Sequence, residues 1–227
     1  MRGQTKYYID DGTGAIEKIV SIEDASDLYR QDPQNTYPPS FYLGCTKCRH
    51  WQIAIGESIG KMYQIRSVVD FGCGLGCYLE GFKKAGATDI RGFEVSYDNA
   101  KLHMSKDIVD NISQNNIMDR IDCGTFDLSM SVEVAEHILP ETSEIFIDNM
   151  VRASNKYILF TAAPPGQGGT CHINEKPMLY WANLFKDRGF EASQLDIDNI
   201  RNELKKIPFR RRSFNMIRNQ IVLFIKK

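Results

Sequence analysis

The chain has 227 residues, of which 42% are hydrophobic and 25% are charged, and its formal net charge at pH 7 is −1. This ordinary composition predicts a globular protein with one well-buried core and room for a short extension. No apolar run approaches membrane-spanning length and the amino terminus lacks the core of a signal peptide, so we expect a cytoplasmic protein without a transmembrane segment.

Residues 1–62 are expected to form an amino-terminal extension ahead of the main fold. The stretch 1–40 mixes acids with turn residues, such as those at 10–14, and contains one helical pattern near 22–29. Between 41 and 63 apolar residues recur at helical spacing, which predicts a single helix leading into the first strand of the main fold.

The six cysteines stand at positions 45, 48, 73, 77, 123 and 171, which is not the spacing of a small disulfide scaffold, so we expect reduced thiols. Cys45 and Cys48 form a C-x-x-C pair with His50 nearby, which is how some zinc sites begin. No second C-x-x-C pair follows, and ordinary packing cysteines are the simpler interpretation.

The stretch 67–79 organises the rest of the chain. Its β-branched residues and Phe71 suit a buried strand, and the glycines that follow let the backbone turn tightly and approach a ligand closely. The spacing G-x-G-x-G departs from the dinucleotide fingerprint G-x-G-x-x-G. Glu94 closes a second strand-like run at 90–93, at a distance that suits an acid holding two ribose hydroxyls. Together these features predict a nucleoside-binding loop.

Strands and helices alternate after this loop. Helices are expected at 78–85, from 97, at 144–153, around 180–185 and up to 206, and further strands at 107–112, 126–132, 157–161, 190–195 and 220–225. This alternation predicts an α/β fold with a doubly wound, mostly parallel sheet. Right-handed crossovers then bring the loops after residues 71, 94, 131 and 161 to one edge, where a ligand binds.

Three segments carry a family resemblance: VVDFGCGLG at 68–76, GFEVS at 92–96 and FDLSMSVEVAEHI at 126–138. Together they resemble the class I S-adenosylmethionine-dependent methyltransferases over roughly residues 65 to 225. The resemblance implies a methyltransferase domain at 63–227 with a Rossmann-like seven-stranded sheet whose last strand is antiparallel. It also implies an enzyme that uses S-adenosylmethionine, as in the methyltransferase domains found in bacteria and phages.

The same resemblance implies roles for individual residues. The glycine loop would pack on the methionine and ribose portions of the cofactor, Glu94 would bind the ribose hydroxyls, and Asp70 would lie near the methionine amino group. A polar contact to the adenine is expected from Asn111, at the end of the third strand. The full set of implied cofactor-binding residues is Asp70, Gly72, Cys73, Gly74, Gly76, Glu94, Val95, Asn111 and Ser131.

In related enzymes the helix ahead of the first strand often walls the cofactor pocket. Four aromatic residues in or near this helix are therefore candidates for contact with the substrate: Tyr37, Phe41, Tyr42 and Trp51. Packing within the core or a lid is the simpler alternative for these four side chains.

The candidate chemistry lies at two neighbouring loops. Glu133, Glu136 and His137 follow the strand 126–132, and His172 lies on the glycine-rich loop after the strand 157–161. In one interpretation these four residues bind Mg²⁺ or Mn²⁺, which holds the acceptor hydroxyl and lowers its pKa. The pattern resembles the E-x-x-E-H motif with a distal histidine of small-RNA 3′-terminal 2′-O-methyltransferases, and the E-x-x-E-H of ubiquinone-pathway O-methyltransferases.

Two other interpretations of these loops stay open. In one, no metal binds, and His137 or His172 is a general base tuned toward neutral pH. In the other, Glu136 and His137 only cap or orient their loop, and His172 hydrogen-bonds a backbone carbonyl.

The leading hypothesis is O-methylation of a small-molecule or glycan hydroxyl, because the loop at 164–177 resembles bacterial and phage methyltransferases presumed to act on sugars. Residues 201–227 hold nine Lys or Arg and one acid, and Arg210-Arg211-Arg212 motivates an RNA 2′-O-methyltransferase as the alternative. A solvated basic turn would explain these arginines equally well. A cofactor-binding structural or regulatory subunit without catalysis is the third hypothesis.

Overall fold

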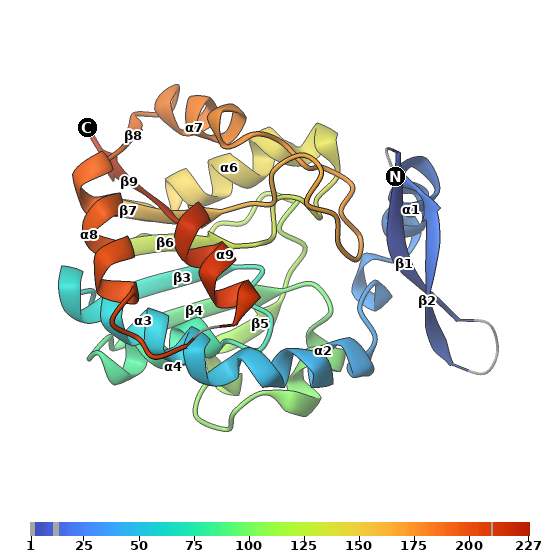
Figure 1. Ribbon diagram of the computed structural model, residues 1–227, viewed down its shortest axis with the longest axis horizontal. Helices are drawn as coiled ribbons and strands as arrows, with labels where there is room; N and C mark the ends of the chain where they lie inside the picture. The colour runs from blue at the N-terminus through green and yellow to red at the C-terminus, as the bar shows by residue number, and fades with distance from the viewer. Residues whose placement is uncertain (1–2, 11–13, 210) are drawn as a thin grey trace.

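The fold is seen in a computed structural model, which describes residues 3–10, 14–209 and 211–227 (Figure 1). Within these residues one sheet of seven strands runs in the order β5-β4-β3-β6-β7-β9-β8. The strands are β3 Ser67–Phe71, β4 Asp89–Glu94, β5 Ile112–Gln114, β6 Phe126–Val132, β7 Ser154–Thr161, β8 Phe190–Ala192 and β9 Val222–Lys226. The strands from β3 to β7 pair in parallel, and β9 is antiparallel to β7 and β8. The predicted doubly wound sheet with an antiparallel last strand is confirmed.

Helices cover both faces of this sheet because the strand residues alternate between two apolar clusters. One face packs on α3 Arg49–Tyr63, α4 Cys77–Lys84, α8 Gln194–Leu204 and α9 Arg212–Gln220, and the other packs on α6 Ser143–Arg152 and α7 Met178–Lys186. Val68 faces the first group of helices, whereas its neighbour Val69 faces the second. No helix in the described part of the chain is long and apolar enough to cross a membrane.

The amino-terminal part forms a hairpin and two helices. β1 Gln4–Asp10 pairs antiparallel with β2 Ala15–Ser21, and α1 Ile22–Gln31 follows, with Ser21 capping its first turn. α2 Pro39–Cys45 comes next. Figure 1 shows the hairpin and α1 beyond one end of the sheet, at the right of the view.

The helix predicted near 22–29 is confirmed, whereas the hairpin was not predicted. The turn residues expected at 10–14 include 11–13, which lie outside the described residues. The single helix expected over 41–63 is wrong, because a 3₁₀ turn at Thr46–Cys48 separates α2 from α3. A boundary between extension and domain at residue 62 stays a prediction.

Three later expectations also differ from the structure. The third strand, expected at 107–112, is β5 Ile112–Gln114, with a 3₁₀ turn at Val109–Asn111 before it. The helix expected from residue 97 is one turn, α5 Tyr97–Ala100. Of the basic turn, Arg210 lies outside the described residues and Arg212 begins α9, a helix that the pattern did not reveal because only Phe214 and Ile217 of its nine residues are buried.

Candidate active site

A cavity of about 230 Å³ lies where the carboxyl ends of β3, β4 and β6 meet. Its lining includes the glycine loop after β3, the end of β4 and the segment after β6. Three of the four loops expected to converge at this edge of the sheet therefore line one cavity, whereas the loop after β7 does not line it. The residues predicted to bind the cofactor that line it are Asp70, Gly72, Cys73, Gly74, Glu94 and Val95.

The glycine loop has the backbone conformation that its composition suggests. Gly72 and Gly74 have φ angles of +79° and +54°, in the left-handed region that side chains disfavour. A Cβ on Gly72 would also stand 2.7 Å from the side chain of Val134. At Gly74 the space is open instead, with no atom within 4 Å of that position. The loop thus leaves its backbone free to approach a ligand.

Two carboxyl groups form the polar part of the cavity. Asp70 is 1% exposed, and its Oδ1 atom has no hydrogen-bond partner among the described residues. Burial, together with the charge of Glu94, raises the pKa of Asp70 to about 8. Glu94 is better satisfied: its carboxylate accepts from the Gly74 N–H (2.9 Å), the Tyr42 hydroxyl (2.9 Å) and the Ser96 N–H (3.1 Å). Asp70 therefore contributes a carboxyl oxygen without a protein partner to the lining of the cavity.

Aromatic side chains from the amino-terminal part close the cavity. Tyr29, Tyr37, Phe41 and Tyr42 line it, so the extension supplies one wall. Trp51, which was grouped with them, packs instead against Phe214 in the core with a ring-centroid distance of 5.9 Å.

Cys45, Cys48 and His50, the residues considered for a zinc site, have separate surroundings. Cys45 lines the cavity and Cys48 is half-buried. His50 directs its ring against Phe209, with a centroid distance of 4.7 Å. The group of potential metal ligands found among the described residues lies elsewhere and includes none of these three.

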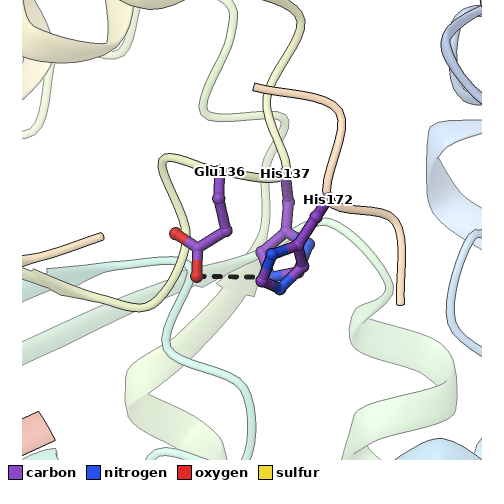
Figure 2. A group of neighbouring side chains, drawn as sticks. All are labelled: Glu136, His137 and His172. Atoms are coloured by element: carbon purple, nitrogen blue, oxygen red, sulfur yellow. Dashed lines mark ion pairs between the residues drawn. The ribbon is translucent and has the colours of Figure 1, made fainter. Parts of the chain in front are cut away.

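Glu136, His137 and His172 form that group (Figure 2), with one ligand atom from each lying within 4.8 Å of the others. Glu136 Oε1 is 3.8 Å from His137 Nε2, and the two imidazole rings meet edge to face. Glu136 is 1% exposed and neither carboxyl oxygen has a hydrogen-bond partner among the described residues. Burial and the nearby Glu133 hold the pKa of Glu136 well above its usual range.

Both histidines are oriented by oxygen atoms that accept a hydrogen bond from Nδ1. His137 Nδ1 lies 3.2 Å from the Cys171 carbonyl oxygen and 3.0 Å from the Tyr37 hydroxyl. His172 Nδ1 lies 2.8 Å from the carboxylate of Glu175. Because a carbonyl and a carboxylate only accept, both contacts place the proton on Nδ1 and leave Nε2 as a free ligand atom.

The glycine-rich loop is held in place around His172. The Glu175 carboxylate accepts from the Gly166 and Gly168 N–H groups, each at 2.6 Å, besides His172. Burial raises the pKa of Glu175, but the three hydrogen bonds together lower it by more. The pKa of Glu175 therefore lies below its usual value. A Cβ on Gly169 would stand 2.1 Å from His172 Nε2, so only glycine allows this close approach.

Glu133 does not join the group, contrary to the four-ligand expectation. Its carboxylate accepts from the Thr161 hydroxyl (2.7 Å) and from the Gln167 amide (3.2 Å), and its φ angle of +56° turns the backbone at this point. Glu133 therefore ties β6 to the glycine-rich loop, while Glu136, His137 and His172 come together.

Three of the predicted cofactor residues have other positions. Asn111 precedes β5, so it lies at the amino end of that strand, where its amide donates to the Ile90 carbonyl at 3.3 Å. Ser131 donates to the Phe71 carbonyl at 2.8 Å inside the sheet. Gly76 immediately precedes α4, and a Cβ there would stand 2.6 Å from Ile112. None of the three lines the cavity.

A second cavity, of about 850 Å³, adjoins the first. Glu133 and His137 line both, and Glu136 and His172 line the second. All three residues of the group therefore line the second cavity, and His137 joins it to the cavity built by the glycine loop. Tyr37, Tyr42 and Glu175, which orient the site, were not predicted in these roles; the position of Glu175 three residues after His172 was the only sequence signal for them.

Comparisons with solved structures place the fold, although no protein-family profile and no curated protein sequence matches the chain. A sugar N-methyltransferase from Streptoalloteichus has 13% identity and a TM-score of 0.58, over 82% of this chain and 91% of its own. An O-methyltransferase family protein from Burkholderia thailandensis has 14% identity and a TM-score of 0.56 over 82% of this chain, which spans only 58% of that protein.

Magnesium protoporphyrin IX methyltransferase from Synechocystis, solved with bound S-adenosylhomocysteine, has 12% identity and a TM-score of 0.52, over 92% of this chain and 89% of its own. All three similarities rest on shape, because the identities are low. They agree with the strand order and the antiparallel β9 described above. The chain therefore has the fold of the class I S-adenosylmethionine-dependent methyltransferases.

Proposed function

We propose that this protein is an S-adenosylmethionine-dependent methyltransferase that methylates a hydroxyl of a small molecule or glycan, assisted by Mg²⁺ or Mn²⁺ at Glu136, His137 and His172. One observation carries the proposal. The glycine-loop cavity, with its unpartnered buried Asp70, adjoins through His137 a second cavity that contains an unpartnered buried glutamate.

The residues of the first cavity fit S-adenosylmethionine. Asp70 offers an oxygen without a partner to an ammonium group, whose charge would replace the carboxyl proton. Glu94 offers carboxylate oxygens to hydroxyls in exchange for its present partners. Gly74 leaves room for close approach of the ligand. When bound, this cofactor supplies a methyl group on a positively charged sulfur. The aromatic wall of Tyr29, Tyr37 and Phe41 would exclude water from it.

The three-residue group fits a divalent cation better than a general base. Burial, followed by the proximity of His172, lowers the pKa of His137 to about 3, which makes its imidazole a weak base at neutral pH. The same neutral imidazole is a good ligand, and so is the Glu136 carboxylate once a cation replaces its proton. The three side chains would hold the cation beside the cofactor cavity, and a cation bound there would lower the pKa of an acceptor hydroxyl.

Two observations support a small hydroxyl-bearing acceptor. Two proteins of similar fold are described as a sugar N-methyltransferase and an O-methyltransferase family protein. They support a small acceptor by analogy of fold. The 850 Å³ cavity beside the cation group is large enough for a sugar-sized acceptor.

Isothermal titration of the whole protein with S-adenosylhomocysteine and, separately, with Mn²⁺ tests the proposal. We expect Asp70→Asn to weaken S-adenosylhomocysteine binding at least about tenfold, through loss of a charge-assisted hydrogen bond, while Mn²⁺ binding is unchanged. We expect Glu136→Gln to weaken Mn²⁺ binding at least about tenfold, because one ligand oxygen is lost, while S-adenosylhomocysteine binding is unchanged.

The exposed Glu23, in the first turn of α1, provides the matched control, and Glu23→Gln should change neither affinity. Absence of S-adenosylhomocysteine binding in folded wild-type protein would remove the methyltransferase proposal. If Mn²⁺ binds equally well to Glu136→Gln and to the wild type, the metal part of the proposal is wrong.

A further inference from the structure

The second cavity has a basic wall that the proposed function leaves unused. Arg211 and Arg212 are exposed and line this cavity together with Ser213 and Met216. They lie on the wall contributed by α9, whereas the acidic and histidine side chains come from the loops after β6 and β7. Within the described residues, neither guanidinium forms an ion pair, so both charges are available to a ligand.

The beginning of α9 adds to the positive character of this wall. The first helical hydrogen bond runs from the Asn215 N–H to the Arg211 carbonyl at 3.1 Å, so the N–H groups ahead of Asn215 point out of the helix end. No side chain caps this end, and its first turn contains no acid. The positive charges of the two arginines repel the partial positive charge at this end of the helix. An anion bound there would relieve that repulsion.

The same cavity contains a side chain that itself indicates a ligand. Glu136 is buried, has no hydrogen-bond partner among the described residues, and lines the same cavity as the arginines. The lining of this cavity therefore combines potential cation ligands with two arginines that can bind an anion. A molecule that carries both a metal-binding hydroxyl and an anionic group would satisfy both sets of residues together.

We propose that the acceptor is a phosphorylated small molecule whose phosphate binds Arg211, Arg212 and the first turn of α9 while its hydroxyl faces Glu136, His137 and His172. The inference rests on the proposed function and names its substrate class. Guanidinium groups bind phosphate with paired hydrogen bonds, which makes phosphate the anion of choice for two neighbouring arginines. A sugar phosphate fits better than an RNA, because the described residues in the rest of the lining include Glu133 and Glu136 and no further lysine or arginine.

Isothermal titration with inorganic phosphate and with ribose 5-phosphate, at low ionic strength and in the presence of Mn²⁺, tests the inference. We expect the double variant Arg211→Gln/Arg212→Gln to weaken ribose 5-phosphate binding at least about tenfold. The matched control is Lys205→Gln/Lys206→Gln, which removes two exposed charges just after α8, outside the cavity, and should change the affinity less than about twofold. Melting temperatures of both variants check that they fold.

Titration of the same proteins with S-adenosylhomocysteine separates this inference from the proposed function. Phosphate binding that is lost in the arginine variant, with unchanged S-adenosylhomocysteine binding, supports the inference. If the wild type binds S-adenosylhomocysteine but neither phosphate ligand, or if both double variants weaken phosphate binding equally, the inference is wrong and the proposed function stands. A short RNA that binds more tightly than ribose 5-phosphate, with a steep salt dependence, would overturn the choice of a small acceptor.

Discussion

At the scale of single residues, Asp70 links the cofactor cavity to pH. Its pKa is about 8 in the folded protein and 3.8 in its ordinary state, so the folded protein holds a proton that the unfolded chain releases between those values. The free energy of unfolding therefore falls as pH rises from about 4 to 8, by up to about 1.4 kcal/mol per pH unit from this group. We expect Asp70→Asn to remove this dependence, measured by urea unfolding at pH 5, 6 and 7.

Comparing the unfolding free energies of the wild type and Asp70→Asn isolates the contribution of Asp70. Glu136, whose pKa is also raised by burial, and His137, whose pKa is lowered, contribute their own slopes, but they do so in both proteins. The difference in unfolding free energy between wild type and variant should therefore change steadily over this range. A constant difference from pH 5 to 7 would mean that Asp70 is ionised in the folded protein.

At the scale of elements, the close packing of α3 on α4 places the glycine loop. A Cβ on Gly56 would stand 2.2 Å from the Tyr78 carbonyl oxygen, and one on Gly81 would stand 2.2 Å from the Ile53 carbonyl oxygen, so the two backbones touch. We expect Gly56→Ala to lower the free energy of unfolding by about 1–3 kcal/mol, because the helices must separate. Chemical denaturation measures this loss.

Gly44 in α2 is the matched control, because a Cβ at that position meets no atom within 4 Å. Gly44→Ala should stabilise the protein slightly, by up to about 1 kcal/mol, through the helix preference of alanine. Equal effects of the two substitutions would show that the contact between α3 and α4 is looser than described.

At the scale of the whole molecule, the amino-terminal part joins the two cavities. The Cys171 N–H donates to the Lys6 carbonyl at 2.6 Å, and the Thr5 hydroxyl donates to the Gly169 carbonyl at 3.1 Å, so β1 holds the loop that carries His172. Further along the same segment, Tyr42 donates to Glu94 in the first cavity. The hairpin and its following helices thus contact both halves of the proposed site.

Ligand binding should therefore slow hydrogen exchange in the amino-terminal part. We expect S-adenosylhomocysteine to increase amide protection in β1 and α1, since the residues that line the cavity and those that pair with the loop belong to one segment. Hydrogen–deuterium exchange with mass spectrometry measures this effect. α8, which packs on the sheet away from both cavities, serves as the internal reference. Unchanged exchange in β1 would show that the hairpin is independent of the cofactor cavity.

Local patterns were sufficient for much of the sheet. The strand at 126–132 was predicted with the bounds it has, because its apolar residues Phe126, Leu128, Met130 and Val132 alternate with polar ones at the two-residue period of a strand. The hairpin β1–β2 escaped prediction because β2 is largely exposed and shows no apolar alternation. β5 has only three residues, too few for a period, and the error in its position also misplaced Asn111.

The sequence by itself determined the fold class, the glycine loop, and Asp70 and Glu94 as the acids of its cavity, because these features depend on short-range spacing within one strand-loop-helix unit. Only the tertiary structure decided which acids join the histidines. Glu133 and Glu136 are equivalent in the motif, yet contacts from Thr161 and Gln167 draw the first away and burial leaves the second without a partner. Such contacts come from residues distant in the chain, and the packing of β7 and its loop sets them.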